Sequence, residues 1–358
     1  MANWYVSRER LKAAANISGV QFNPIVDRVI DAASRDVDRW TRRHFLPKTQ
    51  TRLYRWPQPR PGLATVLWLD QDLLSVTTLQ TQAQNASPTT ISSSDYFLEP
   101  ANSEPDGNRR YNRIEIDLSS TAAFESGDTP QRSISVAGAW GWSNTTASAG
   151  TVDDSGGISS SDTTLIVSDA STIDVGDTLL IDSEQIFVAD RAFAARGSIL
   201  LNMGSNLAAQ NSTVTVTLDG SHGIVAGEVI RLDSEQMYVV SVSTNALTVI
   251  RAWDGSVLAS HNDDVAIHVN RTLTIERGLN GTTAASHSDS GAITRYLPDA
   301  DVARWCLAEA MAVYHQQHSG WGRSVGTGEG ATELEGRDLS QLRQSMVGYY
   351  RRAREAVV

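Results

Sequence analysis

The chain has 358 residues, a length that suits two or three domains. Of these residues 41% are hydrophobic and 20% are charged, which is the composition of a globular protein. Its one cysteine, Cys306, excludes an internal disulfide and zinc-binding cysteine patterns. No apolar run reaches the ~20 residues of a membrane helix and no signal-peptide pattern opens the chain, so we expect a soluble protein made and kept in a reducing compartment.

The excess negative charge lies in the middle of the chain. Residues 1–150 carry 16 basic and 15 acidic residues, residues 151–297 carry 7 and 18, and residues 298–358 carry 7 and 8, giving the net charge of −11. A chain this acidic is not expected to coat nucleic acid non-specifically, because duplex binding depends on neutralising phosphates. The two lysines, Lys12 and Lys48, lie outside glycine-rich loops, which excludes a P-loop nucleotide site.

The first 145 residues predict helices followed by a small antiparallel sheet. Ser7 is a favoured N-cap and Gly19 a favoured stop for the first helix, and a second helix begins near Pro24. The apolar residues of the second helix recur at spacings of three and four: Val26, Val29, Ile30, Ala33, Val37 and Trp40. Strand-like segments separated by turns follow: Thr49–Trp56, Thr65–Leu69, Leu73–Thr81, Asp95–Glu99, Arg113–Leu118 and Arg132–Trp142.

The middle of the chain repeats itself. It is rich in Ser, Thr, Asp, Gly and Val, and segment 176–188 matches 227–239 while segment 247–261 matches 273–287. The order of these pieces predicts one small β module inserted inside its twin. Module B is one complete copy, residues 211–269, and module A is split into a front half, 162–191, and a back half, 271–296. Small modules have little core alone, so packing side by side stabilises both.

The last part, 298–358, predicts helices again. The first follows Pro298, with Trp305 and Cys306 on its buried side, and the last runs from about Asp338 to Arg354 with a basic end that suits the helix dipole. The predicted fold class is therefore α+β. Residues 1–145 and 297–358 form a helical bundle with a small antiparallel sheet, and residues 146–296 form an inserted all-β domain of two similar modules, one nested in the other.

No catalytic, metal or cofactor site emerges from the motifs. His315 and His318 are three apart on a helix, but no neighbouring carboxylate pattern supports a metal. His261 and His287 occupy the same place in the repeat, which favours a structural turn. The carboxylate pairs fall at expected hairpin turns, where Asp and Ser hydrogen-bond the backbone: Asp182 with Glu184 and Asp233 with Glu235. These patterns favour a structural or assembly role over an enzyme.

The order of several segments resembles the head–tail connector (adaptor) proteins of tailed phages. The resemblance covers about 1–145 and 297–358, and the insertion between Trp142 and Pro298 departs from it, because such proteins have a short loop there. The insert is itself similar to small repeated β modules of viral structural proteins. The segments that carry the resemblance are Asp27-x-x-Ile30-Asp31 through Trp40-Thr-Arg-Arg43 to Pro47, residues 67–76, 95–100 and 114–116, Gly138-Ala-Trp140-Gly-Trp142, and Pro298-Asp299-x-x-Val302.

The resemblance implies a homo-oligomeric ring, about twelve-fold, below the portal protein. Such a ring extends the DNA channel, through which DNA passes without sequence-specific binding, and offers a platform for a tail or stopper protein. The protein is then expected in the neck of the virion, after assembly in the bacterial host cytoplasm and without a membrane or cofactor. The acidic insert is expected to project outward from the ring, towards the capsid, a decoration protein or the tail collar.

In this family the C-terminal segment reaches into the portal. Carried over, residues 337–358 are the docking helix, and the glycine-rich stretch before it is a hinge. The candidate hinge residues are Gly320, Gly322, Gly326, Gly328 and Gly330. The candidate portal contacts are Arg343, Tyr349, Tyr350, Arg351, Arg352 and Arg354.

Two other classes of function stay open on the sequence. One is a tail-fibre or baseplate component whose β modules bind carbohydrate. The other is an enzyme such as a polysaccharide lyase, which requires carboxylates or histidines drawn together in space.

Overall fold

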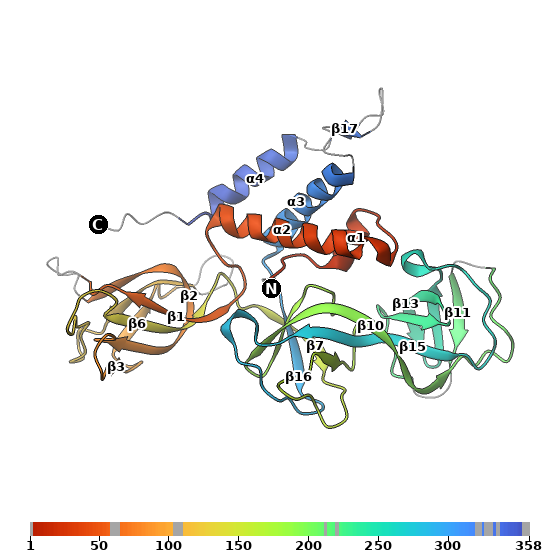
Figure 1. Ribbon diagram of the computed structural model, residues 1–358, viewed down its shortest axis with the longest axis horizontal. Helices are drawn as coiled ribbons and strands as arrows, with labels where there is room; N and C mark the ends of the chain where they lie inside the picture. Colours follow the sequence, from red (N-terminus) through yellow and green to blue (C-terminus); the bar gives the residue numbers. More distant parts are fainter. Residues whose placement is uncertain are drawn as a thin grey trace.

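The computed structural model describes residues 3–57, 65–102, 110–210, 213–218, 222–318, 324–325, 332–333 and 337–352. Figure 1 shows one β-sheet at the left, a longer sheet below and to the right, and a layer of helices above them. Within the described residues, the left sheet has six strands, the long sheet has ten, and four α-helices occur. None of the helices in this part of the chain is long and apolar enough to cross a bilayer.

The helices come from the two ends of the chain. Their bounds are α1 Arg8–Ala14, α2 Asn23–Thr41, α3 Ala300–His318 and α4 Arg337–Tyr350. Short 3-10 turns are η1 Val20–Phe22, η2 Trp253–Gly255 and η3 Leu279–Gly281. The Ser7 side chain accepts a hydrogen bond from the backbone of Arg10, as an N-cap does, and Arg42 ends α2 in a left-handed conformation. The apolar stripe of α2 from Val26 to Val37 is buried, as its spacing predicts, and Trp40 at its end is partly buried.

The left sheet is formed by the segment after α2. Its strands are β1 Lys48–Tyr54, β2 Val66–Thr81, β3 Thr89–Ile91, β4 Tyr96–Glu99, β5 Tyr111–Ile116 and β6 Ile134–Trp140. All pairs are antiparallel in the order β1-β6-β2-β5-β4, and β3 pairs with β2. A hydrophobic cluster of its own includes Leu69, Ile114 and Trp140.

The long sheet is formed by the middle of the chain. Its strands are β7 Thr146–Thr151, β8 Thr164–Ile166, β9 Thr178–Ile181, β10 Glu184–Leu200, β11 Thr213–Thr217, β12 Val229–Leu232, β13 Glu235–Ser243, β14 Ala246–Ile250, β15 Ala266–Glu276 and β16 Ala292–Tyr296. The order is β11-β14-β13-β12-β15-β10-β9-β16-β7, with β8 paired to β15. A two-residue ladder joins β17 Ser324–Val325 to β18 Thr332–Glu333.

The predicted helical bundle with a small antiparallel sheet is wrong, because β-structure dominates the fold. The sequence predicted short strands at 65–69 and 73–81, whereas the structure has one continuous strand, β2, of 16 residues. A register shift between Trp68 and Leu73 bends this strand, so that it pairs with β5 before the shift and mainly with β6 after it. The helices form a layer on β-structure and do not make a separate bundle.

The two β modules each have a hydrophobic cluster. The cluster of module A takes residues from the front half and the back half, including Leu179, Ile186 and Ile293, together with residues 149–158 that precede it. The cluster of module B runs from Leu201 to Val269. Strand β9 of the front half pairs with β16 of the back half. How these units divide into independently folding domains stays a prediction.

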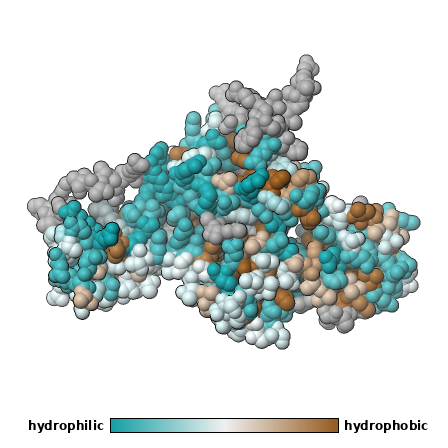
Figure 2. Space-filling view, in the orientation of Figure 1, coloured by the Kyte–Doolittle hydropathy of each residue, from teal (hydrophilic) through white to brown (hydrophobic). Residues whose placement is uncertain are grey.

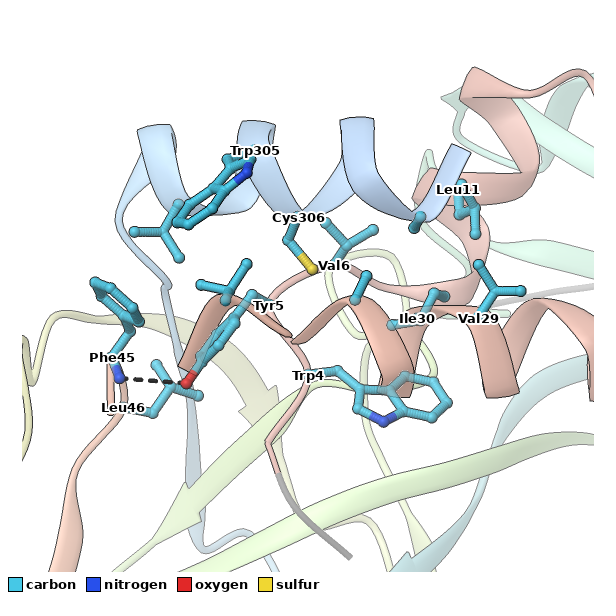
Figure 3. Close-up of a cluster of buried hydrophobic side chains, with 14 of the residues drawn as sticks. Trp4, Tyr5, Val6, Leu11, Val29, Ile30, Phe45, Leu46, Trp305 and Cys306 are labelled. Carbon is cyan, nitrogen blue, oxygen red and sulfur yellow. Dashed lines mark hydrogen bonds between the residues drawn. The ribbon is translucent and has the colours of Figure 1, made fainter. Parts of the chain in front are cut away.

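A further core lies between the helices and module A. It contains Val29 and Ile30 of α2, Trp305 and Cys306 of α3, and Phe45, among others (Figure 3). The Phe45 backbone N–H donates to the Tyr5 hydroxyl across this core. Module A contributes four buried residues to the same cluster: Val175, Phe187, Leu279 and Tyr296. Module A is therefore part of the central core, and whether the insert projects outward from a ring stays a prediction.

Candidate functional site

Helix α4, the expected docking helix, is packed against the rest of the protein. Met346 and Tyr350 are buried in the central core. The ring of Tyr350 meets the ring of Phe45 at 5.4 Å and that of Trp142 at 5.1 Å, both edge to face. Burial raises the pKa of the Tyr350 phenol, and so does the nearby carboxylate of Asp299. Tyr350 therefore belongs to the fold in this structure.

Arg343 joins α4 to α3 and α2. Its Nε and Nη2 atoms donate to the two oxygens of Glu309 at 2.9 and 2.8 Å. Its guanidinium also lies 4.8 Å from the ring centre of Trp40. A bidentate pair with a nearly buried carboxylate orients the guanidinium and combines here with a cation–π contact.

Arg352 joins the end of α4 to the left sheet. Its Nη1 atom donates to Asp72 at 2.8 Å and its Nη2 atom to the Leu69 carbonyl at 2.6 Å. Asp72 is also paired with Arg43, and the Arg43 Nε atom donates to the Tyr350 carbonyl at 2.5 Å. One buried carboxylate thus holds two guanidiniums where α2, α4 and β2 meet.

A basic groove runs along the solvent side of these contacts. It has a volume of about 660 Å³ and is open to solvent. We call it the α4 groove, and its lining residues are Arg42, Arg343, Gln344, Val347, Gly348, Arg351 and Arg352. Four guanidiniums and no carboxylate line it, and the exposed residues Tyr349 and Arg351 lie at the same helix end. Arg343 and Arg352 already pair with Glu309 and Asp72, so the exposed Arg351 is the guanidinium best placed to meet a carboxylate or phosphate group.

The predicted portal contacts therefore fall into two groups, those that pack within the fold and those that are exposed. Arg343, Tyr350 and Arg352 make contacts within the fold, while Tyr349 and Arg351 are exposed. Arg354 lies outside the described residues, as do all five candidate hinge glycines: Gly320, Gly322, Gly326, Gly328 and Gly330.

The repeated carboxylates and histidines come together in two matching clusters. In module A, His287 lies between Asp182, 2.9 Å from Nδ1, and Glu184, 2.8 Å from Nε2. Glu184 also accepts hydrogen bonds from Arg277 at 2.8 and 2.7 Å. Backbone N–H groups of Gly278 and Ala285 donate to the same carboxylate at 3.0 Å each.

Module B repeats this geometry. Glu235 accepts from Arg251 at 2.9 and 2.6 Å, and His261 lies between Asp233 and Glu235 at 2.8 and 2.9 Å. Burial opposes the ionised form of Glu235. Hydrogen bonds from Arg251, the Ala259 and Ala252 backbone and His261 outweigh this effect and lower the pKa of Glu235 to about 2. The same causes act on Glu184 in module A, whose pKa is also about 2.

These clusters anchor loops. Each glutamate is fully buried, and its oxygens accept hydrogen bonds from an arginine, a histidine and two backbone N–H groups. Glu235 therefore holds the loop after β14 in place, and Glu184 holds the loop after β15. Asp182 and Asp233 have left-handed backbones in tight hairpins, in agreement with the turn interpretation. The arginine partners were not predicted from the sequence, although Arg251 and Arg277 occupy one position of the repeat.

The other histidine pair gives no metal site. His315 lies beside the Tyr314 ring at 5.7 Å, and the side chain of His318 lies outside the described part of the chain. Across the described residues, no group of three or more His, Cys, Asp or Glu side chains is placed to hold a metal ion.

Comparison with known proteins gives no relative for this chain: no family model, no curated protein and no solved structure matches it.

Proposed function

We propose that this chain is a structural virion protein, a head–tail connector that forms a ring below the portal and carries the tail or stopper protein. The proposal rests on the ordered segments of residues 1–145 and 297–358 that resemble this family. In it the chain has no catalytic role, and DNA passes through the ring without sequence-specific contacts.

One observation supports the proposal above the others. The rings of Trp40 and Trp305 stack at 5.7 Å, so the two flanks of the long insertion meet in one core. The resemblance requires this arrangement, because its segments are divided between the two ends of the chain. A protein whose ends folded into separate units would not support the connector assignment.

The α4 groove is the surface we assign to the portal. It is basic, it lies at the end of the helix that the resemblance makes the docking helix, and Tyr349 and Arg351 are exposed beside it. Aromatic and arginine side chains contribute strongly to protein interfaces. The partner surface is expected to present a carboxylate to the exposed Arg351 and an apolar contact to Tyr349.

The test is co-purification with the cognate portal protein. Arg351→Glu and Tyr349→Ala, which alter exposed side chains, are expected to weaken binding by at least about tenfold together. Arg10→Glu is the matched control, because Arg10 is exposed on α1, at the other end of the helical layer (Figure 1). Electron microscopy of the complex then shows whether the chain forms a ring. Full portal binding by the double variant, or binding without a ring, contradicts the proposal.

A further inference from the structure

The N-terminal segment docks on one face of module A, formed by β9, β10 and the η3 turn. The Thr178 hydroxyl donates to the Asn3 side chain at 3.3 Å, and the Asn280 amide donates to the same oxygen at 2.8 Å. The Gln185 amide donates to the Pro47 carbonyl at 3.2 Å and accepts from Asn280 at 2.7 Å.

Trp4 supplies the apolar part of this contact. Its ring meets the ring of Phe187 edge to face at 5.3 Å. Phe187 is 1% exposed and Leu279 is 7% exposed, and both lie in the cluster that contains Trp4 and Tyr296. The N-terminal segment, with Trp4 as its apolar contact, therefore covers this face of module A.

Module B has the same face at the same positions of the repeat. The two repeat offsets place Val229 at the position of Thr178, Gln236 at that of Gln185, Trp253 at that of Leu279, Asp254 at that of Asn280, and Asn270 at that of Tyr296. The strand pairing agrees, because Arg231 pairs with His268 in module B as Leu180 pairs with Thr294 in module A.

These five module B residues line one wall of a cavity of about 330 Å³. Trp253 is 38% exposed, whereas its counterpart Leu279 is buried. The Gln236 side-chain amide makes no hydrogen bond within the described residues, whereas its counterpart Gln185 makes two. Hydrophobic residues gather on the right-hand side of Figure 2, over module B and the adjoining helices. Part of the module B face is also covered by this chain, because Asp254 accepts from the Gly19 backbone N–H at 2.9 Å and pairs with Lys12. Trp253 and Gln236 line the cavity that remains.

The opposite wall of the cavity comes from α1, the loop after it and β10. Its cations are already paired with carboxylates of the same lining: Arg8 with Asp190 at 2.6 Å, Lys12 with Asp254 at 2.7 Å, and Arg191 with Glu9 at 4.0 Å. A charged occupant therefore finds no unpaired counter-charge among these three pairs. An uncharged segment with an apolar side chain and backbone hydrogen-bonding groups suits the cavity better.

We propose that this cavity binds an extended, uncharged peptide segment of a partner protein, which places an aromatic side chain against Trp253 and a backbone group at the Gln236 amide. In module A, Trp4 packs against Phe187 and the Pro47 carbonyl accepts from Gln185. In module B the ring of Tyr238, the counterpart of Phe187, stacks on Trp253 at 4.7 Å, so the exposed part of Trp253 takes the place of Phe187 as the contact for the peptide. The site is separate from the α4 groove and does not depend on the connector role.

The probe is a labelled synthetic peptide with the sequence of residues 1–7 of this chain, titrated into the full-length protein by fluorescence anisotropy. The protein's own N-terminal segment already covers module A, and variants of each module distinguish binding at module B from exchange at module A. Replacing the peptide's tryptophan, Trp4→Ala, is expected to weaken binding by at least about tenfold.

Variants of the protein locate the site. Gln236→Ala and Trp253→Ser are expected to weaken peptide binding, whereas Trp253→Leu, which copies Leu279, retains it. Val257→Thr, which copies the twin residue Thr283 at an exposed position outside the cavity lining, is the neutral control. Thermal unfolding of each variant checks that it is folded.

Three outcomes overturn the inference. The first is that the peptide does not bind. The second is binding that survives Gln236→Ala and Trp253→Ser but is lost in Gln185→Ala, which assigns the peptide to module A. The third is that a glycan array gives binding that Trp253→Leu abolishes while the peptide gives none, which assigns the cavity to carbohydrate.

Discussion

The indole rings of Trp40 and Trp305 stack with their centres 5.7 Å apart and their planes at 20°. The Trp305 N–H donates to Glu309 at 2.9 Å, and Glu309 in turn holds Arg343 of α4. Arg343 lies 4.8 Å from the ring centre of Trp40. These contacts join α2, α3 and α4, so the N-terminal and C-terminal parts of the chain depend on each other.

Trp305→Ala tests this dependence. Trp305 is fully buried, and removing a buried indole costs about 3–5 kcal/mol of unfolding free energy. The substitution also leaves Glu309 without one donor. Denaturant unfolding followed by circular dichroism measures the loss. Trp68→Ala is the control, because Trp68 is half exposed on the left sheet and its removal is expected to cost much less. Equal losses for both variants would contradict the central role of the stack.

Part of the fold could be predicted from local pattern. The three-and-four spacing of Val26, Val29 and Ile30 gave the buried face of α2, because helix periodicity depends on neighbours along the chain. The continuity of β2 through the bend between Trp68 and Leu73 could not be predicted, since it depends on pairing with β5 and β6 far along the chain. β3 was missed because only three residues pair.

The role of module A in the central core was not visible in the sequence either. Phe187 occupies the same position of the repeat as Tyr238, but their spatial neighbours differ: Phe187 is buried against Trp4, whereas Tyr238 stacks on Trp253 and stays partly exposed. The contacts of the candidate site could not be predicted for the same reason. The basic end of α4 was visible, but the partners of Arg343 and Arg352 are Glu309 and Asp72, which lie far away in the sequence.

Glu235→Gln tests the loop anchor of module B. The variant keeps the shape of the side chain but leaves the buried Arg251 guanidinium without its counter-charge, which is expected to cost about 3–5 kcal/mol. Chemical denaturation measures the change. Asp233→Asn is the matched control: Asp233 contacts the same histidine, but its side chain is 60% exposed and asparagine tolerates the left-handed backbone. If Asp233→Asn destabilises as much as Glu235→Gln, the buried glutamate is not the anchor.

The same carboxylates predict an acid limit of stability. The pKa of Glu184 and that of Glu235 are lowered to about 2 in the fold, from the ordinary value of 4.5 that a solvated glutamate has in the unfolded chain. Their contribution is therefore complete above about pH 4.5 and is lost as the pH falls towards 2, at up to about 1.4 kcal/mol per pH unit for each group. Unfolding free energies measured from pH 6 to pH 2 give this slope. Glu235→Gln, if it folds, should flatten it, and an unchanged slope in that variant would contradict the assignment.

Two deletions test which β module the central core requires. Removal of 147–296 takes away Phe187 and Leu279, exposes Trp4 and divides the central cluster, so the remainder is expected to aggregate or to bind a hydrophobic dye without fixed tertiary structure. Removal of 196–267, with Asn-Gly joining Ala195 to His268, takes away the module B cluster except Val269, and with it Glu228 and Asp254, the partners of Arg271 and Lys12. Ala195 and His268 are partners across β10 and β15, so a two-residue turn closes the hairpin where the strands already pair. The shorter deletion is expected to leave a soluble protein with a cooperative unfolding transition and the near-ultraviolet dichroism of a packed aromatic core.

A well-folded product of the longer deletion would contradict the requirement for module A. It would show that the helices and the left sheet fold without it, because Trp4 and Phe45 would then have to pack only against residues of the two ends of the chain.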